Sequence, residues 1–429
     1  MKIPITIALL AASAVSAQTA PPVKLIAAPD ASSKPGFGLV AAVRQLPNGR
    51  LLINDVAKRQ LVMLDPSLAS ATVIADSVSG GANSYGPRPG ALVGYFADST
   101  LFIDPADLSM FVIDPTGNIA RVAAVPRSQD AGFMGSNLTG SPAIDGRGRL
   151  VYRGSPPRMM PQISSGGAFS MPELPDSSAI VRVDLATRKL DTAAFFKISK
   201  VKMNMTQSDK GGMMMTSEIN PMQTLDDWAV LADGSIAIVR GRDYHIDWIA
   251  PDGSMASSPK MAFDWQRLTD EDKVAVIDSA KAAAERTRSA INIGGASGPV
   301  VGGGGDGGGV RTVVTFGGGD GARSGGPAGA PGLAPLTFVS ASELPDYRPV
   351  FSGNAVKADL DGNVWVRTSA VRAGSVAGGP IYDVINRQGV VIDRLQVPAG
   401  RSIVGFGKGG VVYMLARDDK GAWVERTHR

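Results

Sequence analysis

The most constraining feature of this chain is an internal repeat of short strand–turn–strand units, in which two apolar segments flank a tight turn containing Gly or Asp. Six such units occur along the sequence, at residues 44–53, 92–103, 143–152, 229–238, 356–366 and 403–413. Apolar runs joined by a turn of this kind predict β-hairpins. The chain is therefore expected to be an all-β protein assembled from hairpins.

A second turn follows most of these units and indicates a second hairpin. These turns lie at residues 65–66, 114–117, 184–187, 251–253 and 386–389. Corresponding turn residues are 50 residues apart from Gly49 to Ser99, 49 from Ser99 to Gly148 and 48 from Gly362 to Gly410. A four-stranded unit that repeats about every 40–50 residues is typical of a β-propeller blade. We predict a six-bladed β-propeller of four-stranded antiparallel blades.

The last repeat is one strand short, because it ends at residues 423–426. The apolar segment at residues 23–26 is expected to supply the missing strand and close the ring. Closure would remove the free sheet edges that otherwise promote aggregation.

Two segments carry a resemblance to a known superfamily. Asp-Leu-Asp-Gly-Asn-Val-Trp-Val-Arg at residues 359–367 and Ile-Asp-Gly-Arg-Gly-Arg-Leu-Val-Tyr at residues 144–152 resemble repeats of six-bladed propellers of the NHL and TolB-like kind. The resemblance covers most of the mature chain through short motifs and implies a secreted bacterial branch. That superfamily includes lactonases, lyases, sugar dehydrogenases and interaction modules, so the resemblance implies the fold without selecting an activity.

The N-terminus has the pattern of a secretory signal peptide. Lys2 precedes an apolar run at residues 5–15, and Val15-Ser16-Ala17 provides the small residues of a cleavage site. We expect residues 1–17 to be removed near Ala17, with an uncleaved N-terminal anchor as the alternative. Residues 18–429 would then form one propeller domain in the periplasm or outside the cell. No later segment approaches the roughly 20 apolar residues of a membrane span.

Two gaps depart from the repeat and mark insertions. Gly148 and Gly234 are 86 residues apart, and Gly234 and Gly362 are 128 apart. The largest insertion, between blades 4 and 5, contains a predicted helix at about residues 264–291, which opens on a capping box from Thr269 to Asp272. Residues 294–335 then consist almost entirely of Gly, Ala, Pro and Ser, a composition that predicts disorder.

The insertions are predicted to share one face of the ring. With strands named A to D from the axis outward, all of them fall in B–C or D–A connections, at residues 155–178, 197–225, 255–353 and 369–379. Long loops on a rigid scaffold commonly carry function. We therefore expect a ligand site on this loop-bearing face.

Alignment of the repeats places six charged residues near the end of strand B, close to the central mouth: Asp55, Asp104, Arg153, Arg240, Arg367 and Arg417. Converging guanidinium groups suit a carboxylate, a phosphate or an acidic glycan. The alternative is that each arginine pairs with a neighbouring aspartate. Arg242 and Tyr347 are further candidates for ligand binding at this face.

Candidates for catalysis are few, because the chain contains no Cys and only two His, one of them His428 beside the C-terminus. The absence of Cys excludes a thiol enzyme and a thiolate zinc site, and two histidines nearly exclude a multi-His metal centre. Asp243, Tyr244 and His245 form the densest polar and aromatic cluster and are the catalytic candidates, with a structural role for His245 as the alternative. No Gly-x-Ser-x-Gly motif indicates a nucleophile.

Several methionines crowd one inserted segment, at residues 203, 205, 213, 214 and 215. Thioethers can bind Cu(I), but they also form adaptable apolar surfaces. The Gly-rich run lacks the Gly-Lys-Ser/Thr ending of a phosphate loop. The sequence therefore predicts neither a metal nor a cofactor.

Together these observations predict a secreted or periplasmic propeller that binds an anionic or extended ligand, such as an acidic small molecule, a peptide or a cell-envelope glycan. The alternative is a lactonase, lyase or glycosidase acting at the central mouth, and the sequence leaves open whether the protein is an enzyme. The 43 basic and 39 acidic residues give a net charge of only +4, which does not favour nucleic acid as a partner. We expect a monomer.

Overall fold

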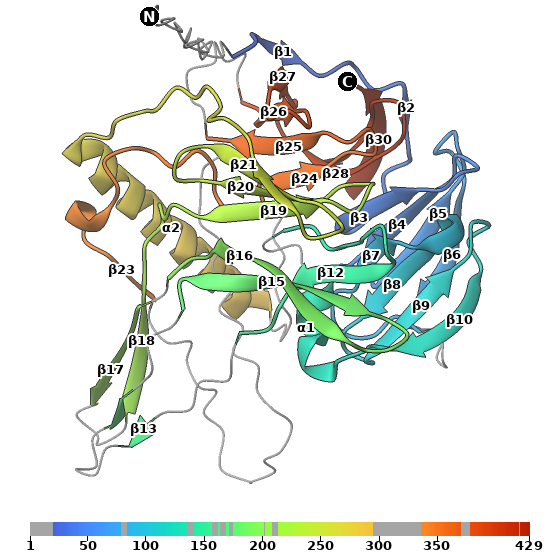
Figure 1. Ribbon diagram of the computed structural model, residues 1–429, viewed down its shortest axis with the longest axis horizontal. Helices are drawn as coiled ribbons and strands as arrows, with labels where there is room; N and C mark the ends of the chain where they lie inside the picture. The colour runs from blue at the N-terminus through green and yellow to red at the C-terminus, as the bar shows by residue number, and fades with distance from the viewer. Residues whose placement is uncertain are drawn as a thin grey trace, which may run out of the picture.

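Six antiparallel sheets surround a common axis in the computed structural model (Figure 1), which confirms the predicted six-bladed propeller. Contacts between the innermost strands run in ring order from blade 6 through blades 1, 2, 3 and 4 to blade 5. The structure describes residues 20–78, 84–135, 140–156, 162–163, 169–170, 175–200, 202–207, 213–294, 336–369, 378–419 and 421–429. The predicted signal peptide and residues 295–335 of the Gly-rich segment lie outside the described residues.

The first three blades each contain four consecutive strands of the predicted hairpins. Blade 1 consists of β3 (Val40–Gln45), β4 (Leu51–Asp55), β5 (Gln60–Leu64) and β6 (Ala71–Asp76). Blade 2 consists of β7 (Ala91–Gly94), β8 (Thr100–Asp104), β9 (Ser109–Ile113) and β10 (Ile119–Ala124). Blade 3 consists of β11 (Ala143–Ile144), β12 (Arg149–Arg153), β15 (Ser177–Asp184) and β16 (Leu190–Lys197).

The other three blades follow the same order from the axis outward. Blade 4 consists of β19 (Asp226–Val230), β20 (Ile236–Arg240), β21 (His245–Ile249) and β22 (Met255–Ser257). Blade 5 consists of β24 (Val356–Ala358), β25 (Val364–Thr368), β26 (Ile381–Ile385) and β27 (Val391–Gln396). Blade 6 consists of β28 (Arg401–Phe406), β29 (Val411–Asp418) and β30 (Gly421–His428), and the N-terminal segment completes it.

The N-terminal segment closes the ring through different residues from those predicted. β2 (Ala31–Ser32) pairs antiparallel with β30 and becomes the fourth strand of blade 6. The apolar segment expected in that position forms β1 (Val23–Leu25), which instead pairs in parallel with β27 and adds a fifth strand to blade 5. One short segment therefore covers the outer edges of two adjacent blades.

The repeated turns are explained by an aspartate that caps its own turn and a glycine with positive φ. Asp359 accepts backbone N–H bonds from Asp361 at 3.0 Å and Asn363 at 2.8 Å, and Gly362 has a φ of 86°. Asp145 and Gly148 repeat this arrangement in blade 3, where the φ of Gly148 is 80°. Aspartate stabilises such turns by binding backbone N–H groups, and glycine adopts the left-handed conformation without steric cost.

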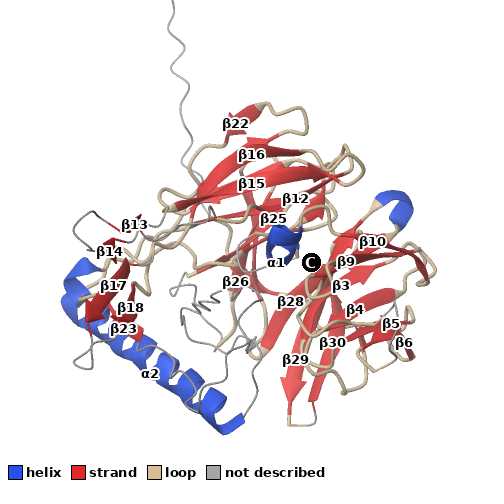
Figure 2. Ribbon diagram, turned by 90° about the horizontal axis from the view of Figure 1, so that it is seen from below, coloured by secondary structure: helices blue, strands red, loops and turns tan. Residues whose placement is uncertain are grey.

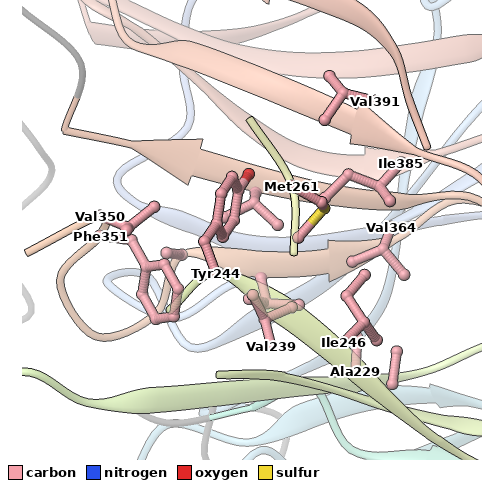
Figure 3. Close-up of a cluster of buried hydrophobic side chains, with 14 of the residues drawn as sticks. Ala229, Val239, Tyr244, Ile246, Met261, Val350, Phe351, Val364, Ile385 and Val391 are labelled. Atoms are coloured by element: carbon pink, nitrogen blue, oxygen red, sulfur yellow. The ribbon is translucent and has the colours of Figure 1, made fainter. Parts of the chain in front are cut away.

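Apolar side chains pack between the faces of neighbouring blades. Figure 3 shows one such cluster, in which Val239 and Ile246 of blade 4 meet Val364 and Ile385 of blade 5. All four side chains are fully buried. Equivalent clusters fill the other blade interfaces and hold the ring rigid, so the loops are carried on a fixed scaffold.

The insertions form additional structure beside the ring (Figure 2). β17 (Lys202–Gln207), β18 (Met213–Ile219) and β23 (Leu336–Phe338) make a small sheet, and β13 (Gln162–Ile163) pairs with β14 (Phe169–Ser170). The methionine-rich segment thus falls on β17 and β18, and the structure describes only its backbone. Short helical turns occur at η1 (Phe96–Asp98), η2 (Ser128–Asp130), α1 (Ala131–Met134) and η3 (Ala341–Glu343).

The predicted helical insertion is α2 (Asp270–Gly294), which lies next to β23 and η3. The helix begins later than residue 264 because Thr269 and Asp272 form the capping box at its start. The Asp272 N–H donates to Thr269 Oγ1 at 3.2 Å, and the Thr269 N–H donates to Asp272 Oδ2 at 2.9 Å. Leu268 and Ile277 pack there with Leu344, and this small core joins separate insertions. Among the described residues, no helix is both long and apolar enough to cross a lipid bilayer.

Candidate functional site

The loop-bearing face carries every long connection between strands. The extra segments leave the ends of strands B or D, whereas the A–B and C–D turns on the opposite face are tight. The charged residues that were aligned in the sequence lie at or next to the ends of strands β4, β8, β12, β20, β25 and β29 on this face. Their surroundings differ from blade to blade, and the differences decide which of them can meet a ligand.

The two aspartates in this set hold the backbone that enters their blades. Asp55 accepts N–H bonds from Gly38 at 2.8 Å and Leu39 at 3.0 Å. Asp104 accepts N–H bonds from Gly86 at 2.6 Å and Ala106 at 2.9 Å. Both carboxylates are fully buried, so their role is to fix the chain at the edge of the blade.

Arg240 is engaged by two carboxylates. Its Nε lies 2.7 Å from Asp247, one terminal nitrogen lies 2.7 Å from Asp226, and the same nitrogen donates to the Phe195 carbonyl at 3.2 Å. Although burial favours the neutral form, these two aspartates hold the pKa of Arg240 above its ordinary value. The alternative of pairing with aspartate therefore describes this arginine, and its role is to join strands.

The other three arginines have surroundings that differ from those of Arg240. Arg153 donates to Ser178 Oγ at 3.1 Å and lies 5.8 Å from the ring centre of Phe133, and burial lowers its pKa. Arg417 donates to the Gly38 carbonyl. The Arg367 side chain has no hydrogen bond or ion pair with any described residue. Among the described residues nothing pairs with Arg367, which makes it the candidate of this set for an external anion.

The remaining ligand-binding candidates stand apart from one another. Arg242 is exposed in the B–C turn of blade 4. Tyr347 is 49% exposed. It forms an antiparallel β-bridge with Arg267, which lies just before α2. Tyr347 thus belongs to the inserted structure rather than to a strand end.

The catalytic candidates are held by internal contacts. Tyr244 is fully buried with a φ of 51°, and its hydroxyl donates to Asp383 Oδ2 at 2.8 Å. His245 has Nδ1 at 2.7 Å from Asp243 and Nε2 at 3.3 Å from Asp247. Because Tyr244 is enclosed in a blade interface, it does not reach the mouth as expected from the sequence and leaves the set of ligand-facing candidates.

A hollow of about 310 Å³ lies on the loop-bearing face between blades 3 and 4. Its lining combines an aromatic side chain with the Arg240–Asp226 ion pair: Asp176, Ser177, Phe195, Phe196, Lys197, Asp226 and Arg240. Phe195 is 60% exposed, whereas Phe196 is buried. An exposed aromatic ring beside charged groups can hold an extended ligand with both apolar and polar faces.

Sequence reasoning missed Phe195 as a candidate. The signal was the Phe195-Phe196 pair at the end of a strand, since consecutive residues point to opposite faces and only one of them can enter the core.

A second hollow of about 270 Å³ lies near the C–D turn of blade 4, where Arg387 lies 5.3 Å from the ring centre of Trp248. That hollow is on the face of tight turns. In the described part of the chain, no group of three or more acidic or histidine side chains is arranged to hold a metal ion.

The fold and the placement of its long connections define the chain as a six-bladed β-propeller with one loop-bearing face. A member of the DUF4221 family from Bacteroides vulgatus ATCC 8482 is 10% identical, over 96% of this chain and 97% of that chain, with a TM-score of 0.44. Virginiamycin B lyase from Staphylococcus aureus, in a catalytically inactive form with quinupristin, is 10% identical over 94% and 98%, with a TM-score of 0.36.

A further similar structure is the PQQ-bound aldose sugar dehydrogenase from Streptomyces coelicolor, which is 10% identical over 95% of this chain and 99% of that chain, with a TM-score of 0.38. No family model and no curated protein sequence matches the chain. Because identities are this low and the named proteins differ in chemistry, the comparisons do not select an activity.

Proposed function

We propose that this protein is an exported β-propeller of NHL or TolB-like kinship that binds an anionic or extended ligand, a peptide or a cell-envelope glycan, on its loop-bearing face. The observation that carries this proposal is the gathering of all long connections on one face of a rigid ring. The small core around Leu268 and Ile277 includes Met222, so two of these connections pack together. Loops organised in this way on a scaffold commonly form binding surfaces.

Two features of the same face support the ligand class. The hollow between blades 3 and 4 presents the exposed ring of Phe195 beside charged side chains. On the next blade, Arg367 has no acidic partner among the described residues. An extended ligand that carries a carboxylate or phosphate group would complement both features.

The enzymatic alternative has less support. Both ring nitrogens of His245 lie near carboxylates, and the hydroxyl of Tyr244 is enclosed. A general base needs an atom within hydrogen-bond reach of the substrate; the enclosed Tyr244 hydroxyl offers none, and Asp243 and Asp247 compete with a substrate for the His245 ring nitrogens.

The test is a thermal-shift screen of the protein against acidic and neutral oligosaccharides and peptides at fixed ionic strength. We expect acidic extended ligands to raise the melting temperature, because a ligand that binds only the folded state stabilises it. Phe195→Ser should weaken this response. Phe96→Ser is the control, since Phe96 is 53% exposed and lies in an A–B turn on the opposite face. If no acidic ligand stabilises the protein, or if both variants respond like the wild type, the proposed site is wrong.

Export is tested separately by intact-mass analysis of the protein recovered from the periplasmic or extracellular fraction. A mature chain that begins at residue 18 is expected from the Val15-Ser16-Ala17 pattern. Recovery of an unprocessed chain only in the cytoplasm would contradict this part of the proposal.

A further inference from the structure

Three hydrogen-bond donors lie on one face of blade 5, the face turned towards blade 6. They are the amine of Lys357 in β24, the guanidinium of Arg367 in β25 and the hydroxyl of Tyr382 in β26. Lys357 lies opposite Trp365, and Arg367 lies opposite Tyr382. Residues directly opposed in antiparallel strands share a face, and Trp365 and Tyr382 pack against core residues of blade 6.

These donors lie at the loop-bearing end of the blade. Lys357 is the second residue of β24, which follows the long D–A connection, and Arg367 is the last residue but one of β25. β24 is the innermost strand of its blade. Lys357 is thus nearest the axis, and Arg367 and Tyr382 follow on the next two strands outward, on the side where the long connections gather.

The charges in this cluster are not balanced by a free acid. Burial lowers the pKa of Lys357, the positive charge of Arg367 lowers it further, and Asp227 acts in the opposite direction. The Asp227 carboxylate is already engaged by four backbone N–H groups, at 2.7–3.1 Å, from Gly140, Trp228, Ala355 and Val356. Asp227 therefore holds three blades together and has little capacity left for Lys357.

The donors have no acceptor in the part of the chain that the structure describes. None of the three side chains makes a hydrogen bond or ion pair with another described residue. Tyr382 is buried, whereas Lys357 keeps partial exposure although the protein surrounds it. Holding a partly buried cation beside a second cation is unfavourable unless an opposite charge compensates. Ion pairing with an external anion would remove this cost.

We propose that Lys357, Arg367 and Tyr382 bind an oxyanion group, a carboxylate or a phosphate, of the ligand. The guanidinium offers paired donors, the amine adds a point charge and the phenol adds a neutral donor. This inference rests on the proposed function and gives it a location on blade 5. It also explains why Arg367, unlike Arg240, has no aspartate partner among the described residues.

The test compares the wild-type protein with Lys357→Met in thermal-shift and calorimetric titrations. The probes are inorganic phosphate and glucuronate, with glucose as the neutral control, at constant ionic strength. We expect phosphate, glucuronate or both to stabilise the wild type, and whichever binds identifies the oxyanion. Lys357→Met should weaken this binding by roughly tenfold to a hundredfold, as expected for the loss of a charge-assisted hydrogen bond.

The melting temperature without ligand gives a readout of opposite sign. Because the substitution removes a poorly compensated cation, Lys357→Met should melt at or above the wild-type temperature. A purely structural lysine would give a lower temperature. Lys58→Ala is the matched control, because it removes one positive charge from an exposed position in the B–C turn of blade 1, on the same face, and should leave anion binding unchanged.

Arg367→Gln provides a second variant if Lys357→Met fails to fold, and it should also lose the response. If phosphate or glucuronate stabilises both variants as much as the wild type, the oxyanion site is wrong while the proposed function stands. A wild type that responds to acidic oligosaccharides or peptides, but to neither small probe, would also overturn it. A wild type that responds to no anionic ligand would overturn both.

Discussion

The hydroxyl of Tyr244 in the B–C turn of blade 4 donates a 2.8 Å hydrogen bond to Asp383 Oδ2 in β26 of blade 5. Arg394 donates to the other oxygen of Asp383 at 3.1 Å. Tyr244 adopts a φ of 51°, which is uncommon for a bulky residue, so the local conformation carries a cost that its burial and this bond offset. The contact joins two blades and makes Tyr244 a structural residue.

Replacing Tyr244 with Phe should lower the free energy of unfolding by about 1–3 kcal/mol, because buried Asp383 loses a donor. Burial raises the pKa of Asp383, while Tyr244 and Arg394 act against that rise. Removal of the hydroxyl raises this pKa further, so the loss should shrink as the pH falls from 7 to 4, because protonation removes the charge that the hydroxyl stabilises. Urea denaturation at both pH values measures it. Tyr347→Phe is the control, and an equal effect of the two variants would contradict the assignment.

Tyr85 should make the protein lose stability at alkaline pH. Its hydroxyl donates to Asn54 Oδ1 at 2.9 Å and accepts the Gly90 N–H at 2.9 Å, and burial raises its pKa from 10.0 to about 12. Since the folded-state pKa is the higher one, this contribution is fully present below pH 10 and is lost as the pH rises through about 12. A shift of this size corresponds to roughly 3 kcal/mol.

The measurement is the free energy of unfolding in urea across this alkaline range, with tyrosinate absorbance recorded in parallel. Tyr85→Phe will be less stable at every pH because Gly90 and Asn54 lose their partner, so the slope and not the level is the informative quantity. The variant should show a shallower fall than the wild type. Identical slopes would show that Tyr85 does not titrate as argued.

The sequence was sufficient for the ring because its turns are encoded locally. Each Asp binds its own turn and each Gly supplies the positive φ, so residues such as Asp359 and Gly362 mark a hairpin without any distant partner. The strand that closes blade 6 was misassigned because short apolar segments suit many sheet edges. Distant contacts position it, including the Val424 N–H that donates to Ser33 Oγ at 3.0 Å.

The candidate site was less accessible to prediction for a related reason. Strand periodicity places Arg240 and Arg367 at equivalent positions, but it does not show which side chains the neighbouring strands of the same blade bring beside them. Arg240 faces Asp226 and Asp247, which come from neighbouring strands, whereas Arg367 faces Lys357 and Tyr382. Tertiary neighbours therefore separate a structural arginine from a candidate ligand-binding one.

The N-terminal segment should contribute strongly to stability because it covers two sheet edges. Ile26 is buried in the interface between blades 5 and 6, and β2 completes blade 6. A variant that begins at Pro35 should lose about 3 kcal/mol or more, from the burial of Ile26 and the lost hydrogen bonds. It should also self-associate, because β30 becomes an open edge.

Urea denaturation and sedimentation velocity measure these two effects. A variant that begins at Pro22 is the control, since it keeps both β1 and β2. A shortened protein that is as stable and monodisperse as this control would show that closure does not depend on the N-terminal segment.

His245 distinguishes the binding and enzymatic interpretations of the loop-bearing face. Its ring lies between Asp243 and Asp247, and Lys260 lies 3.2 Å from the second oxygen of Asp243. These contacts are partly exposed, so His245→Gln should cost no more than about 1 kcal/mol in urea denaturation. Its response to an acidic ligand that stabilises the wild type should be unchanged, with Arg367→Gln as the variant that loses the response. If His245→Gln keeps wild-type stability but no longer responds to the ligand, the imidazole contacts the ligand. If the variant no longer converts a ligand that the wild type converts, the result favours an enzyme.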